Sequence, residues 1–373
     1  MKINLLIDSN NFLNKVLFGL QKYSDRKRSI PGYIAPKFSQ TEHIPNDEVE
    51  DLFFEKIGID FNYLLKDVPT PDNIFFLKDA KSWRKKVLIN GEMSYKSSRK
   101  KKLQEKNIDW NRFDNALNKF LEENSGIIPI KIDGLEADDL VYLLNEQLIE
   151  ENPNCLNIIM STDGDFNQLL GYNTIIYNYL HTNPRFLISS KYELLEYKNM
   201  ARGSLFENKS KNPFDMSNTN FTGKLMDSKD IFESIQNNFS IESEDPELSI
   251  FTKVLYGDPK DDVPNIYYWE HTNSKGDLVT IKVTPKFYNK IIEYYKSHDI
   301  SISMDNFLTK ENAKLLKILI ETYTKKEVDL KLLATNLKRN RLLLYLSKNT
   351  IPEKLVEKFS NEFESFKDKL NLS

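Results

Sequence analysis

The sequence predicts an α/β protein with a mostly parallel central sheet flanked by helices. Two observations support this: short apolar runs typical of strands buried on both faces, and stretches of helical periodicity between them. The apolar runs are Ile3–Ile7, Asn73–Leu77 and Leu156–Met160. A third observation predicts a functional site. An acid follows each run, and because parallel strands end at the same edge of a sheet, these acids should gather there. These acids are Asp8, Asp79 and Asp163.

The other elements follow from periodicity and turn residues. Ile127–Ile132 has the composition of a further strand, and Gly276-Asp277 is typical of a hairpin turn within Tyr267–Val283. The predicted helices are Phe12–Leu20, Asp47–Leu65, Asp109–Glu123, Leu140–Leu148, Leu248–Tyr256 and most of the chain after Lys286. The pattern predicts an α/β domain over residues 1–190, an insertion or linker over 191–245, and a helical domain over 246–373.

Two segments crowd five carboxylates into short stretches. Glu136–Asp139 begins a helix, whose dipole favours anions, and Asp163–Asp165 follows a strand, where an extended backbone would point both aspartates the same way. Each segment alone has a simpler interpretation, as a solvated first helical turn or as a tight turn. Gathered at one sheet edge, the carboxylates would resist ionisation unless a cation lay between them. An all-carboxylate, partly hydrated site suits Mg²⁺.

A basic segment with interspersed aromatics follows the second strand. It comprises Lys81–Lys86 and Tyr95–Lys102, so it includes Arg84, Lys100 and Lys101. A solvated helix face and a localisation signal are the simpler interpretations of such a run. Beside an acidic metal site, these cations are better placed to hold phosphates, with Tyr95 or Trp83 available to stack on a base.

Composition limits the class of protein. The chain has 373 residues, 40% of them hydrophobic, which is enough for a buried core. Its 52 Lys and Arg against 55 Asp and Glu give a net charge of −3, which argues against a nucleic-acid partner unless the carboxylates hold metal. The single cysteine, Cys155, excludes an internal disulfide and indicates a reducing compartment. No apolar stretch approaches a membrane span, so we expect a cytoplasmic protein.

The acidic motifs occur in a distinctive order. The motifs are Asp8, Asp79-Ala80-Lys81-Ser82, Tyr95-Lys96-Ser97-Ser98-Arg99, Glu136-Ala137-Asp138-Asp139, Ser161–Phe166 and Thr252–Asp261. Taken together they resemble the structure-specific 5′ nucleases, which include flap endonucleases, the 5′-nuclease domains of bacterial polymerases and phage 5′ exonucleases. The sequence is most similar to the RNase H enzymes of T-even bacteriophages.

The resemblance implies a role for each motif. A PIN-like 5′-nuclease core would carry an arch over about residues 80–110, and Gly257–Pro264 would be the turn of a helix-three-turn-helix element that grips a duplex. The first metal would be held by Asp8, Asp79, Glu136, Asp138 and Asp139, and the second by Asp163, Asp165, Asp258 and Asp261. Catalytic arch residues would be Tyr95, Lys96 and Arg99, and nucleic-acid contacts would come from Arg84, Lys100, Lys101, Lys102, Gly257 and Lys260. The sequence departs from the family pattern at Asp262, where an asparagine is usual.

The implied activity is hydrolysis of phosphodiesters at the 5′ ends of duplex, flap or RNA–DNA hybrid substrates by two Mg²⁺ ions, for which Mn²⁺ could substitute, with K⁺ at the helix-three-turn-helix. Such an enzyme would remove primers during phage-like DNA replication, as a monomer in the host cytoplasm, and could dock on a single-strand-binding protein or clamp. A PIN-type ribonuclease is the nearest alternative, but it lacks the basic arch. A non-catalytic binder of branched DNA is the other, and clustered acids without metal would repel its ligand.

Overall fold

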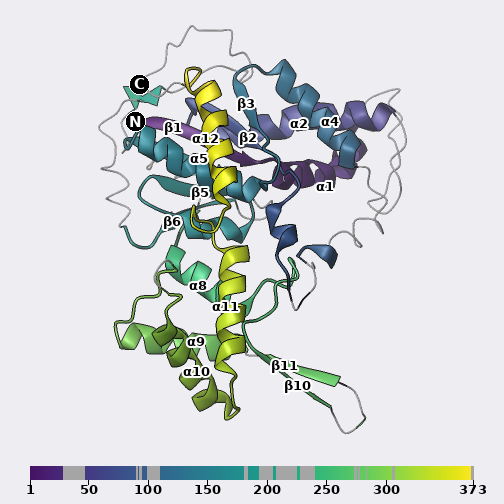
Figure 1. Ribbon diagram of the computed structural model, residues 1–373. Coiled ribbons are helices and arrows are strands. Elements are labelled where there is room, and N and C mark those ends of the chain that lie inside the picture. Colours follow the sequence, from purple (N-terminus) through teal and green to yellow (C-terminus); the bar gives the residue numbers. More distant parts are fainter. Residues whose placement is uncertain are drawn as a thin grey trace. The chain divides into compact units, whose positions relative to one another are not determined.

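The computed structural model resolves the chain into two compact units, and each is described by itself (Figure 1). We call Met1–Ser82, Lys102–Glu244 and Glu353–Ser373 the sheet unit, and Trp83–Lys101 with Asp245–Pro352 the helical unit. The residues that the structure describes are 1–27, 47–89, 91, 95–98, 110–179, 184–192, 205–206, 225–226, 240–272, 275, 278–282, 284–304 and 307–370.

Seven strands form the central sheet of the sheet unit, in the order β3-β2-β1-β4-β5-β6-β9. All neighbours pair in parallel except β5 and β6, which confirms the predicted mostly parallel sheet. The strands β1, β2, β3 and β4 therefore end at one edge. The strands are β1 (Lys2–Asp8), β2 (Asn73–Leu77), β3 (Ile127–Ile130), β4 (Cys155–Met160), β5 (Thr174–Asn178), β6 (Arg185–Ser189) and β9 (Ser240–Glu244).

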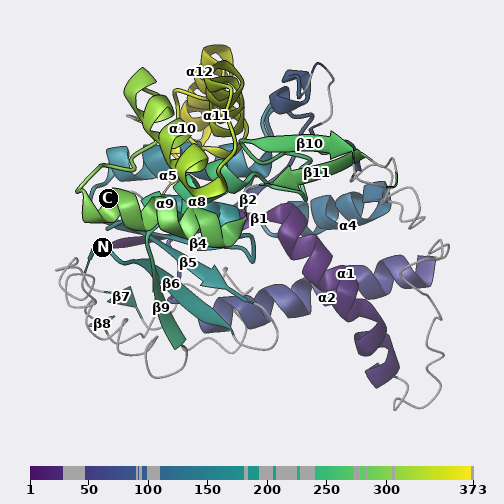
Figure 2. The ribbon, with the colours of Figure 1, turned by 90° about the horizontal axis from the view of Figure 1, so that it is seen from below.

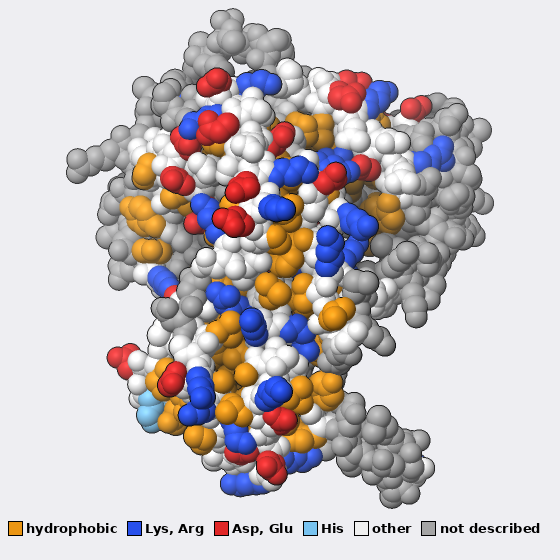
Figure 3. Space-filling view, viewed as in Figure 1, with side chains coloured by type: hydrophobic (Ala, Val, Ile, Leu, Met, Phe, Trp, Pro, Cys, Tyr) orange, Lys and Arg blue, Asp and Glu red, His pale blue; other side chains and the backbone are white. Residues whose placement is uncertain are grey.

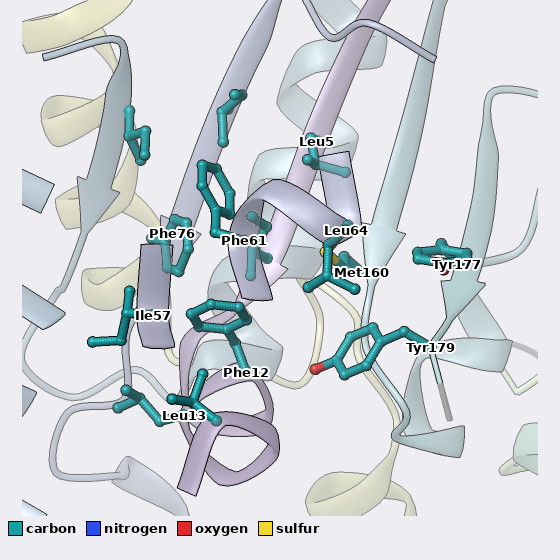
Figure 4. Close-up of a cluster of buried hydrophobic side chains, with 14 of the residues drawn as sticks. Leu5, Phe12, Leu13, Ile57, Phe61, Leu64, Phe76, Met160, Tyr177 and Tyr179 are labelled. Atoms are coloured by element: carbon teal, nitrogen blue, oxygen red, sulfur yellow. The ribbon is translucent and has the colours of Figure 1, made fainter. Parts of the chain in front are cut away.

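Helices cover both faces of this sheet, which is why β2 and β4 are buried along their whole length and mostly apolar (Figure 2). On one face lie α1 (Ser9–Lys27), α2 (Asp47–Asp67) and α4 (Trp110–Glu123), and on the other α5 (Ala137–Glu151) and α12 (Glu353–Lys367). Figure 4 shows the first interface, where the Phe12 ring meets Phe61 and Phe76 edge to face at centroid distances of 6.4 and 5.5 Å. No described helix is long and apolar enough to cross a membrane.

A row of buried amides fixes the register of the middle strands. Asn4 on β1 is paired with Asn73 on β2 and Asn157 on β4. Asn73 Nδ2 donates to Asn4 Oδ1 at 2.8 Å, and Asn4 Nδ2 donates to Asn157 Oδ1 at 2.8 Å. Asn157 in turn donates to Asn145 Oδ1 on α5 at 3.0 Å. A one-residue slip would leave these groups buried without partners, so the row favours a single register and ties α5 to the sheet.

The helical unit packs its helices around a second core. Phe251 on α8 meets Phe307 edge to face at 4.8 Å and Tyr295 at 5.6 Å. Helix starts follow the expected capping chemistry, since Asp245 accepts from the Leu248 amide and Pro246 occupies the first turn. The predicted hairpin is present as an antiparallel pair. The elements are η1 (Trp83–Lys86), α8 (Pro246–Tyr256), β10 (Tyr268–Thr272), β11 (Leu278–Lys282), α9 (Pro285–Ser297), α10 (Lys310–Thr324) and α11 (Leu330–Leu344).

The units differ from the predicted domains in three places. The segment Trp83–Lys101, expected within the 1–190 domain, belongs to the helical unit. The helix α12, expected within the 246–373 domain, belongs to the sheet unit, because its apolar stripe packs there. The ring centroids of Phe366 and Phe75 lie 6.3 Å apart, and Lys367 Nζ forms a 2.6 Å ion pair with Glu151 Oε1. Strand β9, expected within the 191–245 insertion, pairs with β6 and completes the sheet. Most of the rest of that insertion lies outside the described residues, which include the short pair β7 (Leu205–Phe206) and β8 (Leu225–Met226).

Candidate metal centre

Three aspartates gather at the carboxyl edge of the sheet. Asp8 is the last residue of β1, Asp79 comes two residues after β2, and Asp163 three residues after β4. Burial raises the pKa of the Asp8 carboxyl to about 7, and the negative charges of Asp79 and Asp163 add to the rise. The three carboxylates are therefore electrostatic neighbours, as the strand pattern predicts.

Each of these carboxylates is held in place by local donors. The Asn11 amide donates to Asp8 Oδ1 at 3.1 Å, and Ser161 Oγ to Asp8 Oδ2 at 3.4 Å. Asp79 Oδ1 accepts from the Ala137 amide at 2.6 Å, at the first turn of α5, where the helix dipole favours an anion. The acids are thus fixed by backbone and hydroxyl groups.

The first turn of α5 carries three more of the predicted ligands. Glu136 is the N-cap residue and is 5% exposed, and Asp139 is fully buried. Asp139 Oδ2 accepts from the Glu136 amide at 3.2 Å, as in a capping box. Asp138 is half-buried. The Glu136–Asp139 pair therefore already has a structural function at the helix start, and its contribution to a metal site stays a prediction.

The second acidic segment differs in conformation from the expectation. The 3₁₀ helix η2 (Gly164–Leu169) begins directly after Asp163, so the backbone is not extended there. Asp163 Oδ1 accepts from the Asp165 amide at 3.1 Å, and the Asp163 amide donates to Ser161 Oγ at 3.1 Å. The side chain of Asp163 thus acts as the cap of η2, and its negative charge contributes to the raised pKa of Asp8.

Three residues of the site were not predicted. Asn11 Oδ1 accepts from the amide and the hydroxyl of Thr162, both at 3.1 Å, and from the Tyr179 hydroxyl. Burial, with the charge of Asp8, holds the pKa of Tyr179 well above its ordinary value, so it remains a neutral donor. Asn11 and Thr162 could have been found from the sequence, because both belong to short polar segments that flank Asp8 and Asp163. Tyr179 follows β5 and carried no local signal.

In the helical unit, the turn after α8 is closed tightly. Gly257 has a φ of +78°, and a Cβ there would lie 2.5 Å from Pro264 and Val263 backbone atoms, so only glycine fits. Asp258 and Val263 exchange two backbone hydrogen bonds at 2.9 Å. Asp258 is paired with Lys253 at 3.0 Å.

The Lys96–Ser98 segment of the predicted arch is anchored on this turn. Lys96 lies 3.6 Å from the Asp261 carboxylate, and its amide donates to Asp261 O at 3.0 Å. Asp262, where the sequence departs from the family, accepts from the Ser98 amide at 2.8 Å and from Ser97 Oγ at 3.3 Å. Asp262 therefore holds the Lys96–Ser98 segment, a function that the sequence did not indicate.

Several predicted nucleic-acid contacts differ or cannot be placed. Arg84 is only 1% exposed, with its guanidinium 4.9 Å from the Trp83 ring centroid, so it is no surface cation. Tyr95 is 6% exposed and packs in the core of the helical unit, with its hydroxyl 3.4 Å from Asp261 Oδ2, so its ring is not presented for base stacking. Lys260 is exposed as expected. The residues outside the described part of the chain are Arg99, Lys100, Lys101 and Lys102.

The donors at the sheet edge suit a divalent metal. They are carboxylate oxygens, which Mg²⁺ prefers, and burial, with the charges of Asp79 and Asp163, opposes the ionisation of Asp8 and raises its pKa. A bound cation would reverse that effect. The residues present therefore fit a divalent cation.

Comparison with known proteins supports the fold. Over 98% of this chain, the structure matches a bacteriophage T5 flap endonuclease in a pseudo-enzyme–product complex with DNA and metal ions, with a TM-score of 0.51, 14% sequence identity and 98% of that chain covered. The same T5 protein co-crystallised with metal ions gives a TM-score of 0.50, 14% identity, and coverage of 98% of this chain and 99% of that one. The chain has a 5′-nuclease fold. No protein-family model and no curated protein sequence matches it.

Proposed function

We propose that this protein is a Mg²⁺-dependent 5′ nuclease that hydrolyses phosphodiesters at the 5′ ends of duplex, flap or RNA–DNA hybrid substrates. The observation that carries the proposal is the meeting of Asp8, Asp79 and Asp163 at the carboxyl edge of a sheet with the 5′-nuclease fold. One T5 flap endonuclease structure of that fold is a complex with DNA and metal ions. RNase H-type primer removal in phage-like replication is the biological role that fits such substrates.

The proposal assigns the carboxylates to two ions. Mg²⁺, or Mn²⁺ in its place, would supply an activated water and stabilise the attacking and leaving oxygens. One ion is assigned to the sheet edge and the first turn of α5, and the other to η2 and the turn after α8. The first set is Asp8, Asp79, Glu136, Asp138 and Asp139, and the second is Asp163, Asp165, Asp258 and Asp261.

The chain's own groups prepare this site. Asn11 and Ser161 hold the Asp8 carboxylate, and the start of α5 holds Asp79, so little reorganisation is needed when a cation binds. Lys96 is paired with Asp261. If Asp261 held a metal, the Lys96 ammonium would be available to bind the substrate phosphate. Arg99 would add a second cation to the same phosphate.

Duplex binding is assigned to the helical unit. On the face drawn in Figure 3, lysine and arginine side chains of this unit lie spread among apolar side chains. Lys260, on the turn after α8, is exposed. We propose contacts with the phosphate backbone from this surface and from Gly257, Lys100, Lys101 and Lys102. The proposal also includes a K⁺ ion at the turn, a monomeric state, a cytoplasmic location and docking on replication proteins. It further includes an insertion within residues 191–245 that ends before β9.

One assay tests the proposal against its alternatives. Labelled 5′-flap, nicked and RNA–DNA hybrid duplexes are incubated with the protein in Mg²⁺ and in EDTA. We expect 5′ products in Mg²⁺ only. Cleavage of single-stranded RNA without dependence on a 5′ end would favour a PIN-type ribonuclease. Binding of branched DNA with no cleavage in Mg²⁺ or Mn²⁺ would favour a non-catalytic binder.

A further inference from the structure

Three polar side chains share one buried face of α11. Asn336, Arg339 and Asn340 are 3%, 9% and 0% exposed, and their spacing of three and four residues aligns them along the helix. The helix packs against α8, which leads into the acid-bearing turn Gly257–Pro264. Buried polar groups of this kind must be hydrogen-bonded, and the partners identify their function.

The two asparagines bind the backbone on both sides of the turn. Asn340 Nδ2 donates to Val254 O at 3.0 Å, before the turn, and to Pro264 O at 2.8 Å, after it. Asn336 Nδ2 donates to Ile266 O at 3.0 Å, two residues further on. One amide group therefore joins the two ends of the turn, and a second holds the segment that leaves it.

Arg339 determines which way both amides face. Its Nε and Nη2 donate to Asn340 Oδ1 at 3.0 and 2.9 Å, and its Nη1 donates to Asn336 Oδ1 at 2.8 Å. With both oxygens bound to the guanidinium, both NH₂ groups must point to the carbonyls of the turn. Burial lowers the pKa of Arg339 to about 10, so the guanidinium remains charged near neutral pH.

We propose that Asn336, Arg339 and Asn340 form a positioning clamp that sets the geometry of the acid-bearing turn. The clamp touches neither Asp258 nor Asp261 through the bonds described above; it acts on the backbone that carries them. Its consequence for metal binding rests on the proposed function, whereas its effect on the turn does not. A duplex-gripping and metal-binding turn needs this support because its own ladder consists of only a few backbone bonds.

The substitution Asn340→Asp separates the clamp from general stability. The carboxylate keeps an oxygen for Arg339 and gives the buried guanidinium an opposite charge, but it cannot donate to Val254 O or Pro264 O. We expect hydrogen exchange at the amides of Asp258, Asp261 and Val263 to accelerate at least tenfold in metal-free protein, and by more than at amides of the central sheet, because the Val254 and Pro264 carbonyls lose their donor. This readout holds whether or not the protein is a nuclease.

Activity supplies the second readout. If the protein is a nuclease, the Mg²⁺ concentration for half-maximal single-turnover cleavage of a 5′-flap duplex should rise at least fivefold in Asn340→Asp. A merely structural role would lower the active fraction and leave this midpoint in place. Asn361→Asp, an exposed site on α12, is the matched control and should change neither readout.

Arg339→Lys is the milder second variant. A lysine keeps the charge but cannot donate to both amide oxygens as the planar guanidinium does. The backbone amides of Asp258, Asp261 and Val263 should therefore exchange hydrogen faster than in wild type and slower than in Asn340→Asp. The variant covers the case in which Asn340→Asp fails to fold. Wild-type exchange at these amides in the folded variants would overturn the clamp. Faster exchange with an unchanged Mg²⁺ concentration for half-maximal cleavage would overturn the link between the clamp and metal binding. Absence of cleavage by the wild type would overturn only the proposed function.

Discussion

The Asp79 carboxylate lies 2.6 Å from the backbone nitrogen of Ala137 and so joins the end of β2 to the beginning of α5. This bond places an acid from one strand beside the acids of a helix 58 residues later in the chain. A carboxylate at a helix N-terminus is stabilised by the helix dipole, whereas burial and neighbouring acids raise the pKa of Asp8. The two acids thus differ in environment.

Removing the central carboxylate should stop the reaction. We expect Asp163→Asn to lower single-turnover cleavage of a 5′-flap duplex in saturating Mg²⁺ by about a hundredfold or more, because Asp163 is assigned to a metal and its negative charge contributes to the raised pKa of Asp8. Asp51→Asn, an exposed change on α2, is the control and should cleave as wild type does. Near-wild-type turnover by Asp163→Asn would rule out its role as a ligand.

The raised pKa of Asp8 predicts how stability depends on pH. The carboxyl titrates at about 7 in the folded protein and near 3.8 when unfolded, so the folded state binds the proton more tightly. Stability of the metal-free protein should therefore fall as pH rises from about 4 to 7 and stay low above that. Asp8→Asn should remove this slope and stabilise the metal-free protein at pH 8 by up to about 4 kcal/mol.

Denaturant unfolding of wild type and Asp8→Asn at pH 5 and pH 8, in EDTA, measures the effect. Saturating Mg²⁺ should flatten the wild-type slope, since a bound cation stabilises the ionised form, and should have less effect on Asp8→Asn. A wild-type protein that is more stable at pH 8 than at pH 5 without metal would contradict the prediction.

Substitutions in the arch should separate chemistry from binding. Lys96→Ala and Arg99→Ala should each slow single-turnover cleavage by about tenfold to a hundredfold, with duplex affinity in Ca²⁺ changed much less, because both cations are assigned to the scissile phosphate. Lys66→Ala, on the exposed side of α2, is the control. If both arch variants lost affinity and kept the wild-type rate, the segment would be a docking surface.

Metal should also govern affinity. Without a cation the acidic cluster repels a polyanion, so binding of a 5′-flap duplex should be weak in EDTA and tighter in Ca²⁺. Asp8→Asn should narrow this difference. Affinity should fall steeply with salt, with a slope of about −0.9 in log K against log salt for each phosphate contact. Fluorescence anisotropy across a salt series measures both effects, and equal affinity in EDTA and Ca²⁺ would remove the two-metal proposal.

The sequence predicted the sheet and its acidic edge because both depend on local pattern. Strands buried on both faces must be apolar, and parallel strands end together, so Asp8, Asp79 and Asp163 could be placed from the sequence alone. Long-range packing could not be read in this way. Arg84 belongs to a basic run that is typical of a surface, and only the fold shows that its side chain is buried. Tyr179 contacts Asn11 across 168 residues, with no local signal.

The position of α12 bears on how the chain folds as it is synthesised. The helix covers α5, yet about 200 residues separate the two, and the whole C-terminal segment of the helical unit is made in between. Until α12 leaves the ribosome, the outer face of α5 and Phe75 beside it have no cover, so the nascent sheet exposes apolar surface that invites aggregation. Contacts this distant in sequence also slow folding. We therefore expect the nascent protein to need a chaperone until α12 has docked.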